Sequence, residues 1–132
     1  MIYGIGVDLV EIARIEAAYV RFGERFARRI LSERELARYH ARRARSDVRG
    51  IAYLATRFAA KEAIAKALGL GMRSPMTWRA VEVLNDASGR PVVAAHGKLE
   101  ELIRRLRLNV HVSLTDERSL ATAYAIAEVA AA

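Results

Sequence analysis

The chain has 132 residues, 53% of them hydrophobic, which is enough for one domain with its own core. It contains no cysteine, which excludes disulfides, a thiol nucleophile and thiolate metal sites. The formal net charge is +7, so we expect an anionic partner, whether nucleic acid, an acidic protein or a phosphorylated small molecule. The first residues, MIYGIGVDLVEIARIE, lack a basic leader, and no apolar run reaches the roughly 20 residues of a membrane span. We therefore expect a cytoplasmic protein that makes no membrane contact.

The first stretch of the chain predicts a β-strand. Met1–Val10 alternates Ile, Gly and Val, and Asp8 falls near the carboxyl end of this stretch. Gly4 and Gly6 leave room for another backbone to approach closely. A carboxylate at this place is either a cap for the next helix or a functional group, and the strand pattern alone favours the cap.

Three short helical patterns follow, and all are rich in arginine. Ser32 and Glu35 form a capping box, which marks the start of the third helix. Residues 44–49 read as a loop, with Asp47 as a possible cap for the helix after it. The predicted helices span Glu11–Arg21, Glu24–Leu31 and Glu33–Arg43.

The central prediction is a long helix over Tyr53–Gly69, reading YLATRFAAKEAIAKALG. One side carries large apolar residues such as Leu54 and Phe58, and the other carries almost only alanine. Because small residues suit close packing, we expect this helix to be buried nearly all round.

The charges on this helix therefore need partners, since an unpaired buried charge costs several kcal/mol, roughly. Glu62 and Lys66 could form an i,i+4 pair worth about 0.3–0.5 kcal/mol. Alternatively, Arg57, Lys61 and Lys66 hold a polyanionic ligand while Glu62 holds a metal. The local excess of positive charge favours the ligand.

The second half mixes strands with one helix. Residues 70–76 contain Gly71 and Pro75 and read as irregular. Because the strands do not alternate strictly with helices, we predict an α+β fold with a small, mostly antiparallel sheet and a single domain over residues 1–132. The predicted elements are the strands Thr77–Leu84, Val92–Ala95, Asn109–Thr115 and Leu120–Val129 and the helix Lys98–Leu108.

Three patches coincide in this chain: GIGVDLVEI at 4–12, RFAAKEAIAKALG at 57–69 and HVSLTDE at 111–117. Together they closely resemble the bacterial holo-acyl-carrier-protein synthases of the 4′-phosphopantetheinyl transferase superfamily. The resemblance extends over nearly the whole chain in length and motif order. It implies the transferase fold and Mg²⁺-dependent transfer of phosphopantetheine from coenzyme A to a serine of acyl carrier protein, which releases adenosine 3′,5′-bisphosphate and serves fatty acid biosynthesis.

The resemblance also implies roles for individual residues. Asp8 and Glu62 become the metal-binding carboxylates, in keeping with the preference of Mg²⁺ for hard oxygen ligands. Lys66 is assigned to the β-phosphate and the leaving group, Lys61 and Arg57 to phosphate binding. Glu62, or a metal-bound water held by Asp8, would take the proton of the carrier serine. A further match is His111, near the 3′-phosphate of the coenzyme.

The implied partner is a strongly acidic carrier protein, docking on the first helix and the segment after it. The family also forms homotrimers with active sites between subunits. Asp116 departs from the pattern, because many relatives have a histidine there, and we assign it no role. The arginines predicted to dock the carrier are Arg14, Arg21, Arg25 and Arg29.

Two functions without catalysis compete with this prediction. A nucleic-acid-binding domain would use the arginine-rich helices, but it leaves Asp8 and Glu62 unexplained, and Trp78 is the only tryptophan available for stacking on bases. An adaptor that docks acidic proteins is the other alternative. Transferase activity explains Asp8 and Glu62 better than either alternative does. We therefore expect a transferase that does not bind nucleic acid.

Overall fold

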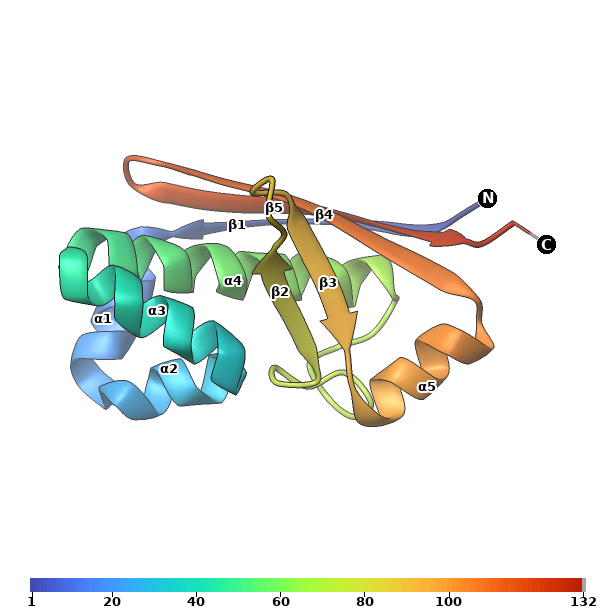
Figure 1. Ribbon diagram of the computed structural model, residues 1–132, viewed down its shortest axis with the longest axis horizontal. Coiled ribbons are helices and arrows are strands. Elements are labelled where there is room, and N and C mark those ends of the chain that lie inside the picture. The colour runs from blue at the N-terminus through green and yellow to red at the C-terminus, as the bar shows by residue number, and fades with distance from the viewer. Residues whose placement is uncertain (132) are drawn as a thin grey trace.

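The computed structural model describes residues 1–131. The long helix α4 runs beneath a three-stranded antiparallel sheet of order β1-β5-β4, with α1–α3 at one end, α5 at the other, and the antiparallel hairpin β2-β3 between them (Figure 1). The predicted α+β class is confirmed. No helix in this part of the chain combines the length and apolar character needed to cross a bilayer. The elements are β1 (Ile2–Glu11), α1 (Ile12–Phe22), α2 (Glu24–Ile30), α3 (Glu33–Arg45), α4 (Asp47–Ala67), β2 (Val81–Asn85), β3 (Pro91–Ala95), α5 (Gly97–Arg105), β4 (Leu108–Glu117) and β5 (Leu120–Val129).

Small residues bring the sheet unusually close to α4. A Cβ atom at Gly4 would lie 2.0 Å from the carbonyl oxygen of Ala67, and one at Gly6 would lie 2.0 Å from that of Ala63. The central strand β5 contributes only alanine to the buried face, and α4 meets it with alanines of its own, so helix and sheet pack almost backbone to backbone. The close approach expected at Gly4 and Gly6 is confirmed. The buried alanines of β5 are Ala121, Ala123, Ala125 and Ala127.

The opposite face of the same sheet is apolar but uncovered within one chain. Because side chains alternate along a strand, the residues between the glycines of β1 point away from α4. Ile5, Val7 and Leu9 are 55%, 55% and 62% exposed, and Tyr124 of β5 lies opposite Val7. A contiguous exposed apolar patch is typical of an interaction surface.

The α3–α4 junction differs from the prediction. The capping box is confirmed, with the Glu35 carboxylate accepting from the Ser32 amide at 2.9 Å. The loop predicted over 44–49 is wrong, because Ser46 alone separates the helices and caps α4 by accepting from the Arg49 amide. Gly50 belongs to α4, where a Cβ would lie 2.8 Å from that of Arg43, so it serves a close helix crossing rather than a loop.

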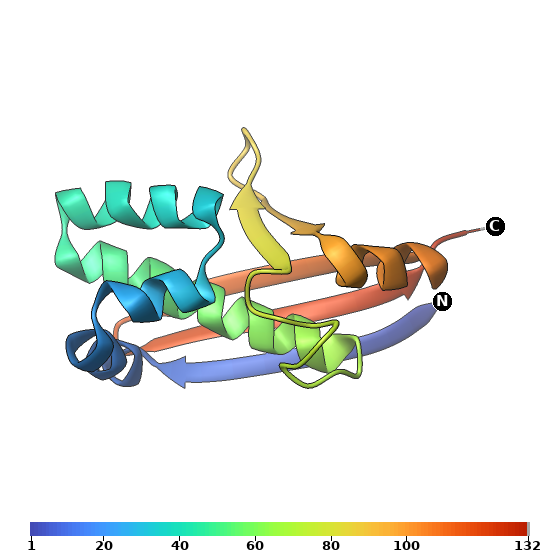
Figure 2. The same cartoon turned by 90° about the horizontal axis from the view of Figure 1, so that it is seen from below.

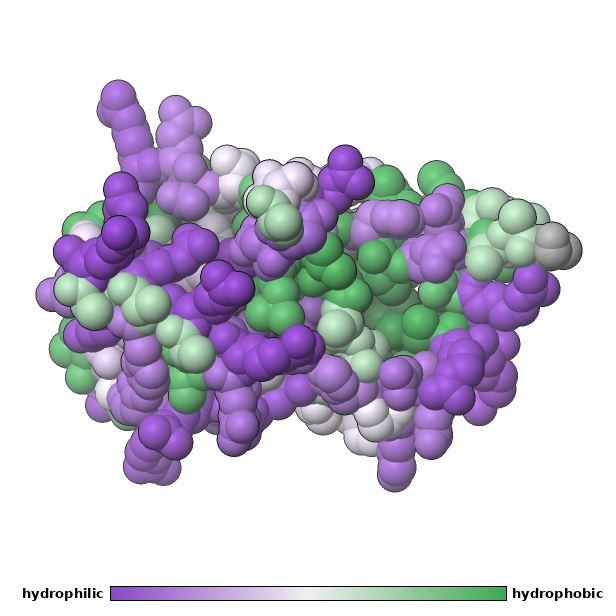
Figure 3. Space-filling model, viewed as in Figure 1, coloured by the Kyte–Doolittle hydropathy of each residue, from purple (hydrophilic) through white to green (hydrophobic). Residues whose placement is uncertain are grey.

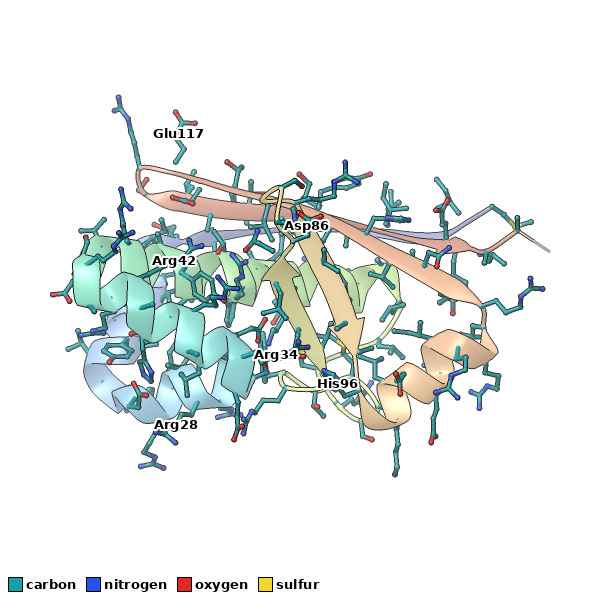
Figure 4. The ribbon with its side chains drawn as sticks, in the orientation of Figure 1. Arg28, Arg34, Arg42, Asp86, His96 and Glu117 are labelled. Carbon is teal, nitrogen blue, oxygen red and sulfur yellow. The ribbon has the colours of Figure 1, made fainter. Side chains whose placement is uncertain are left out.

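Two buried carboxylates fasten the hairpin β2-β3 to α3. Glu35 of α3 accepts from the Val83 amide at 2.7 Å. Glu82 accepts hydrogen bonds from the Ser32 hydroxyl and from Arg34 at 2.7 Å, and lies 2.6 Å from His96 Nε2. Figure 4 labels two of these partners, Arg34 on α3 and His96 at the end of β3. These donors, Arg34 foremost, lower the pKa of Glu82 to about 2. The hairpin is therefore held in place by charge as well as by its apolar face.

Three predicted boundaries shift in the second half. β2 begins at Val81 rather than Thr77, because residues 77–80 form a turn in which the Ala80 amide donates to the Thr77 carbonyl. α5 ends at Arg105, since Arg107 takes a positive φ of 57°. β4 continues to Glu117, paired with Leu120, so that only two residues form the turn into β5.

Candidate active site

Three of the predicted site residues meet where β1 crosses α4. Asp8 shares the inward face of β1 with Gly4 and Gly6, so it points toward the helix. The Lys66 ammonium lies 3.3 Å from Asp8 Oδ1 and donates to the Val7 carbonyl at 2.9 Å. Glu62 stands one turn earlier on α4. Within the described residues no ion pair joins Glu62 to Lys66, so the intrahelical pair considered above does not form.

Asp8 and Glu62 line the same pocket, which has a volume of about 340 Å³. Burial raises the pKa of Glu62, the negative charge of Asp8 raises it further, and Lys66 opposes both effects. The two carboxylates are therefore close enough for their negative charges to repel each other. Such a site stabilises a cation and also retains a proton more readily than an exposed carboxylate does. The other wall residues are Leu9, Val10, Arg14, Ile15, Ala18, Phe26 and Phe58.

The donor set of this pocket fits Mg²⁺. A hard cation of this size is commonly held by one or two carboxylates, with phosphate oxygens and water completing the octahedron. No group of three or more acidic or histidine side chains that could hold a metal occurs in residues 1–131. Asp8 and Glu62 can thus hold Mg²⁺ only if phosphate oxygens of a substrate and water supply the remaining ligands.

Lys61 has a different environment from the one predicted for it. Its side chain is fully buried, and its ammonium donates to Glu35 Oε1 at 2.6 Å and to the carbonyls of Ile30 and Trp78 at 2.6 and 2.7 Å. Burial lowers the pKa of Lys61, while the Glu35 charge opposes this shift. Because all three ammonium protons are used, the predicted phosphate contact of Lys61 is corrected to a structural one.

Arg57 is also buried, but it borders a second pocket of about 490 Å³. Its guanidinium donates to the Val83 carbonyl at 3.1 Å, to Asn85 Oδ1 at 2.7 Å and to the Thr56 hydroxyl at 3.3 Å. A guanidinium carries five N–H groups, so some donor capacity remains for an anion. The same pocket is lined by three arginines for which the sequence indicated no role, together with one acid: Arg42, Arg45, Arg49 and Asp116.

His111 lies apart from both pockets. It occupies the outer face of β4, opposite Ile126, and its Nε2 lies 2.8 Å from Glu128 Oε1. Asp8 points to the other side of the sheet. A single chain therefore does not bring His111 to the carboxylates.

The four predicted docking arginines are exposed and belong to α1 and α2. Arg14 lines that pocket, and Arg25 and Arg29 line an adjoining apolar one of about 330 Å³. Arg21 lies 5.1 Å above the ring of Phe22, another wall of the apolar pocket. Hydrophilic side chains gather over α1–α3 in Figure 3, and arginine is the most frequent charged residue in these three helices. Phe26 and Phe58 line both pockets, so the two pockets are neighbours.

Known proteins share this sequence and fold. Residues 4–127 match the family model of the 4′-phosphopantetheinyl transferase superfamily. A holo-[acyl-carrier-protein] synthase of Cupriavidus pinatubonensis is 56% identical over 128 residues, covering 97% of this chain and 91% of the relative. The crystal structure of holo-[acyl-carrier-protein] synthase from Neisseria meningitidis is similar with a TM-score of 0.88 and 37% identity, covering 97% of this chain and 99% of that one.

A second solved structure, a holo-(acyl-carrier-protein) synthase from Bacillus anthracis in complex with CoA (3′,5′-ADP), is similar with a TM-score of 0.81 and 32% identity, covering 98% and 99% of the two chains. Fold, motifs and near-complete coverage agree. The chain belongs to the 4′-phosphopantetheinyl transferase superfamily.

Proposed function

We propose that this protein transfers the 4′-phosphopantetheine group of coenzyme A to a serine of an acyl carrier protein. The observation that supports it most is that Asp8 and Glu62 line one pocket between β1 and α4, with the Lys66 ammonium 3.3 Å from Asp8 Oδ1. The 56% identity to a holo-[acyl-carrier-protein] synthase and the likeness to a structure in complex with CoA (3′,5′-ADP) support the same substrates. A cytoplasmic location is part of this proposal.

In this reaction the carrier serine oxygen attacks the phosphorus next to pantetheine. The bond from that phosphorus to the bridging oxygen breaks, and adenosine 3′,5′-bisphosphate leaves with the electron pair. Glu62, whose pKa is raised by burial, is suited to accept the serine proton. Lys66 is half-exposed and can turn from Asp8 to the negative charge that develops on the leaving phosphate.

Asp8 and Glu62 would hold Mg²⁺ in this scheme. When bound, the ion would supply charge neutralisation to the pyrophosphate. Arg57, with the arginines around it, offers a basic hollow for other phosphates of the coenzyme. This assignment keeps the predicted role of Arg57 and extends it to Arg42, Arg45 and Arg49.

We further propose that three copies assemble through the uncovered apolar face of the sheet. Burying Ile5, Val7 and Tyr124 would remove exposed apolar surface from water, at about 25 cal/mol per Å². His111 lies on this same face, so assembly would place it beside a neighbouring subunit, where the predicted contact with the 3′-phosphate becomes available. Light scattering should give the mass of three chains, and Val7→Glu should lower it.

The decisive experiment is to incubate the protein with coenzyme A, apo-carrier and Mg²⁺ and to weigh the carrier by mass spectrometry. We expect a carrier heavier by one phosphopantetheine. Asp8→Asn and Glu62→Gln should each abolish most of this change and remain folded, because a neutral amide keeps the shape but loses the charge that holds a cation. Glu16→Gln, on the exposed side of α1, is the matched control and should behave as wild type.

An unchanged carrier mass with wild-type protein would refute the proposal. Binding of nucleic acid or of the acidic carrier without turnover would then favour one of the two functions without catalysis. Near-normal turnover of Asp8→Asn or Glu62→Gln at limiting Mg²⁺ would remove that residue from the metal site.

A further inference from the structure

We propose that Lys61 is a positioning residue: by holding the main chain at Trp78, it fixes the aromatic wall of the pocket beside the carboxylates and so sets the fit of the carrier protein. This inference rests on the proposed function. It assigns a role to the fully buried lysine that the phosphate chemistry leaves unused.

The three hydrogen bonds of Lys61 join three separate parts of the fold. Ile30 ends α2, Glu35 stands in the first turn of α3, and Trp78 belongs to the segment between α4 and β2. That segment has no regular secondary structure and folds back across the C-terminal half of α4 (Figure 2). The ammonium therefore fastens an irregular stretch of chain to the most buried helix.

Trp78 is the residue of this stretch that lines the apolar pocket. It stacks on Phe58 with ring centroids 4.9 Å apart and an angle of 25° between the planes. Phe58 precedes Lys61 by one helical turn. The same turn of α4 therefore carries the Phe58 ring and, through the Lys61 ammonium, holds the main chain of Trp78. Both rings line the apolar pocket with Arg25 and Arg29, and Phe58 also lines the carboxylate pocket.

Stability alone does not account for a lysine at this position. A buried ion pair is weak evidence for stability, because apolar residues of similar volume often serve as well. Glu35 has its own structural partners, accepting from the amides of Val83 and Ser32 at 2.7 and 2.9 Å. What Lys61 adds is a set of directed donors, two of which end on the main-chain carbonyls of Ile30 and Trp78.

The test compares a double variant with a matched single variant. Glu35→Gln removes the buried carboxylate charge. Because burial already lowers the pKa of Lys61 and Glu35 opposes this shift, Lys61 can then lose a proton, and the neutral amine still has two N–H groups to donate to Ile30 and Trp78. Glu35→Gln/Lys61→Met removes both charges of this buried pair and still offers an amide oxygen to Val83, but it removes the donor to Trp78. Lys98→Met, at an exposed site on α5, controls for the loss of one lysine.

Two readouts separate positioning from stability. Trp78 is the only tryptophan, so its emission maximum and acrylamide quenching report this wall directly, well below the melting temperature. We expect the double variant to show red-shifted, more quenchable emission and a KM for carrier raised several-fold, with the KM for coenzyme A unchanged. Glu35→Gln and Lys98→Met should match wild type in emission maximum, in quenching and in both KM values.

Wild-type emission and carrier KM in a folded double variant would overturn the inference, as would an equal change in Glu35→Gln. Should the double variant not fold, Trp78→Leu tests the same wall: an unchanged KM for carrier refutes it, and a rise confined to the carrier supports it. A wild-type protein that does not modify the carrier would refute the proposed function instead, while the fluorescence comparison would still test whether Lys61 holds Trp78.

Discussion

Replacing Gly6 with alanine tests how the site depends on the contact between β1 and α4. The added Cβ would lie 2.0 Å from the Ala63 carbonyl oxygen and 2.8 Å from the Ala67 amide nitrogen. Ordinary contact begins at 3.4 Å, so strand and helix must separate by 1.4 Å along the shortest of these contacts. Backbone atoms cannot rotate away, and we expect the upper part of the usual cost of overpacking, about 2–3 kcal/mol.

The same displacement should reach the chemistry, because Asp8 is the next residue on the inward face of β1. A misplacement of about 1 Å can lower turnover by roughly 100-fold. We therefore expect Gly6→Ala to melt lower by about 4 °C for each kcal/mol lost and to transfer phosphopantetheine far more slowly even when fully folded.

Circular dichroism melts and the carrier mass assay, run well below the melting temperature of the variant, measure the two effects separately. Gly71→Ala is the control, since its Cβ would meet only the Arg73 side chain at 3.7 Å. A Gly6→Ala protein with wild-type melting temperature and turnover would show that the tight crossing does not position Asp8.

Three further predictions address single side chains. Lys66→Ala should melt near wild type, because the pair of Lys66 with Asp8 is half-exposed and contributes roughly a few tenths of a kcal/mol to stability. Its turnover should fall about 100-fold, because a contact to the leaving phosphate is lost. Full activity would make Lys66 merely an ion-pair partner. Arg21→Glu should raise the KM for carrier several-fold and leave the KM for coenzyme A unchanged. Added salt should have the same effect on the wild-type protein, because exposed charges are screened over about 8 Å at physiological salt. Equal rises in both KM values would assign Arg21 to the nucleotide. Glu82 has a pKa lowered to about 2 from 4.5, so its contribution to stability should be complete above pH 4.5 and disappear as the pH falls through 2. Urea unfolding from pH 6 to 2 should show this loss in wild type and less of it in Glu82→Gln, and identical pH profiles would contradict it.

The sequence predicts the elements better than their ends. The α2 and α3 helices, the hairpin and the strands of the sheet appear from apolar periodicity and capping alone, since these depend on neighbouring residues. The start of α4 was missed because DVRG looks like a loop, whereas Gly50 is needed where α3 crosses α4. A contact between helices leaves no local pattern in either one.

The site divides in the same way. The motifs pointed to Asp8, Glu62 and Lys66, and the fold brings them together. The ion pair between Lys61 and Glu35 could not be predicted. Glu35 lies 26 residues away from Lys61, and its place in the capping box already accounted for its carboxylate. Arg45 and Arg49 were overlooked for a related reason: both fell in the loop predicted over 44–49, so no helix placed them near Arg57.

The alanine contact between α4 and β5 determines where this molecule can deform. Alanine has no side-chain rotamers, so the contact cannot rearrange by small torsional steps, and helix and sheet must move as one body. Asp8 is carried by that sheet and Glu62 by that helix. The spacing of the two carboxylates should therefore be the same before and after substrates arrive. Adjustment to a carrier protein falls instead to α1–α3, whose larger side chains and long arginines can take up new conformations at little cost.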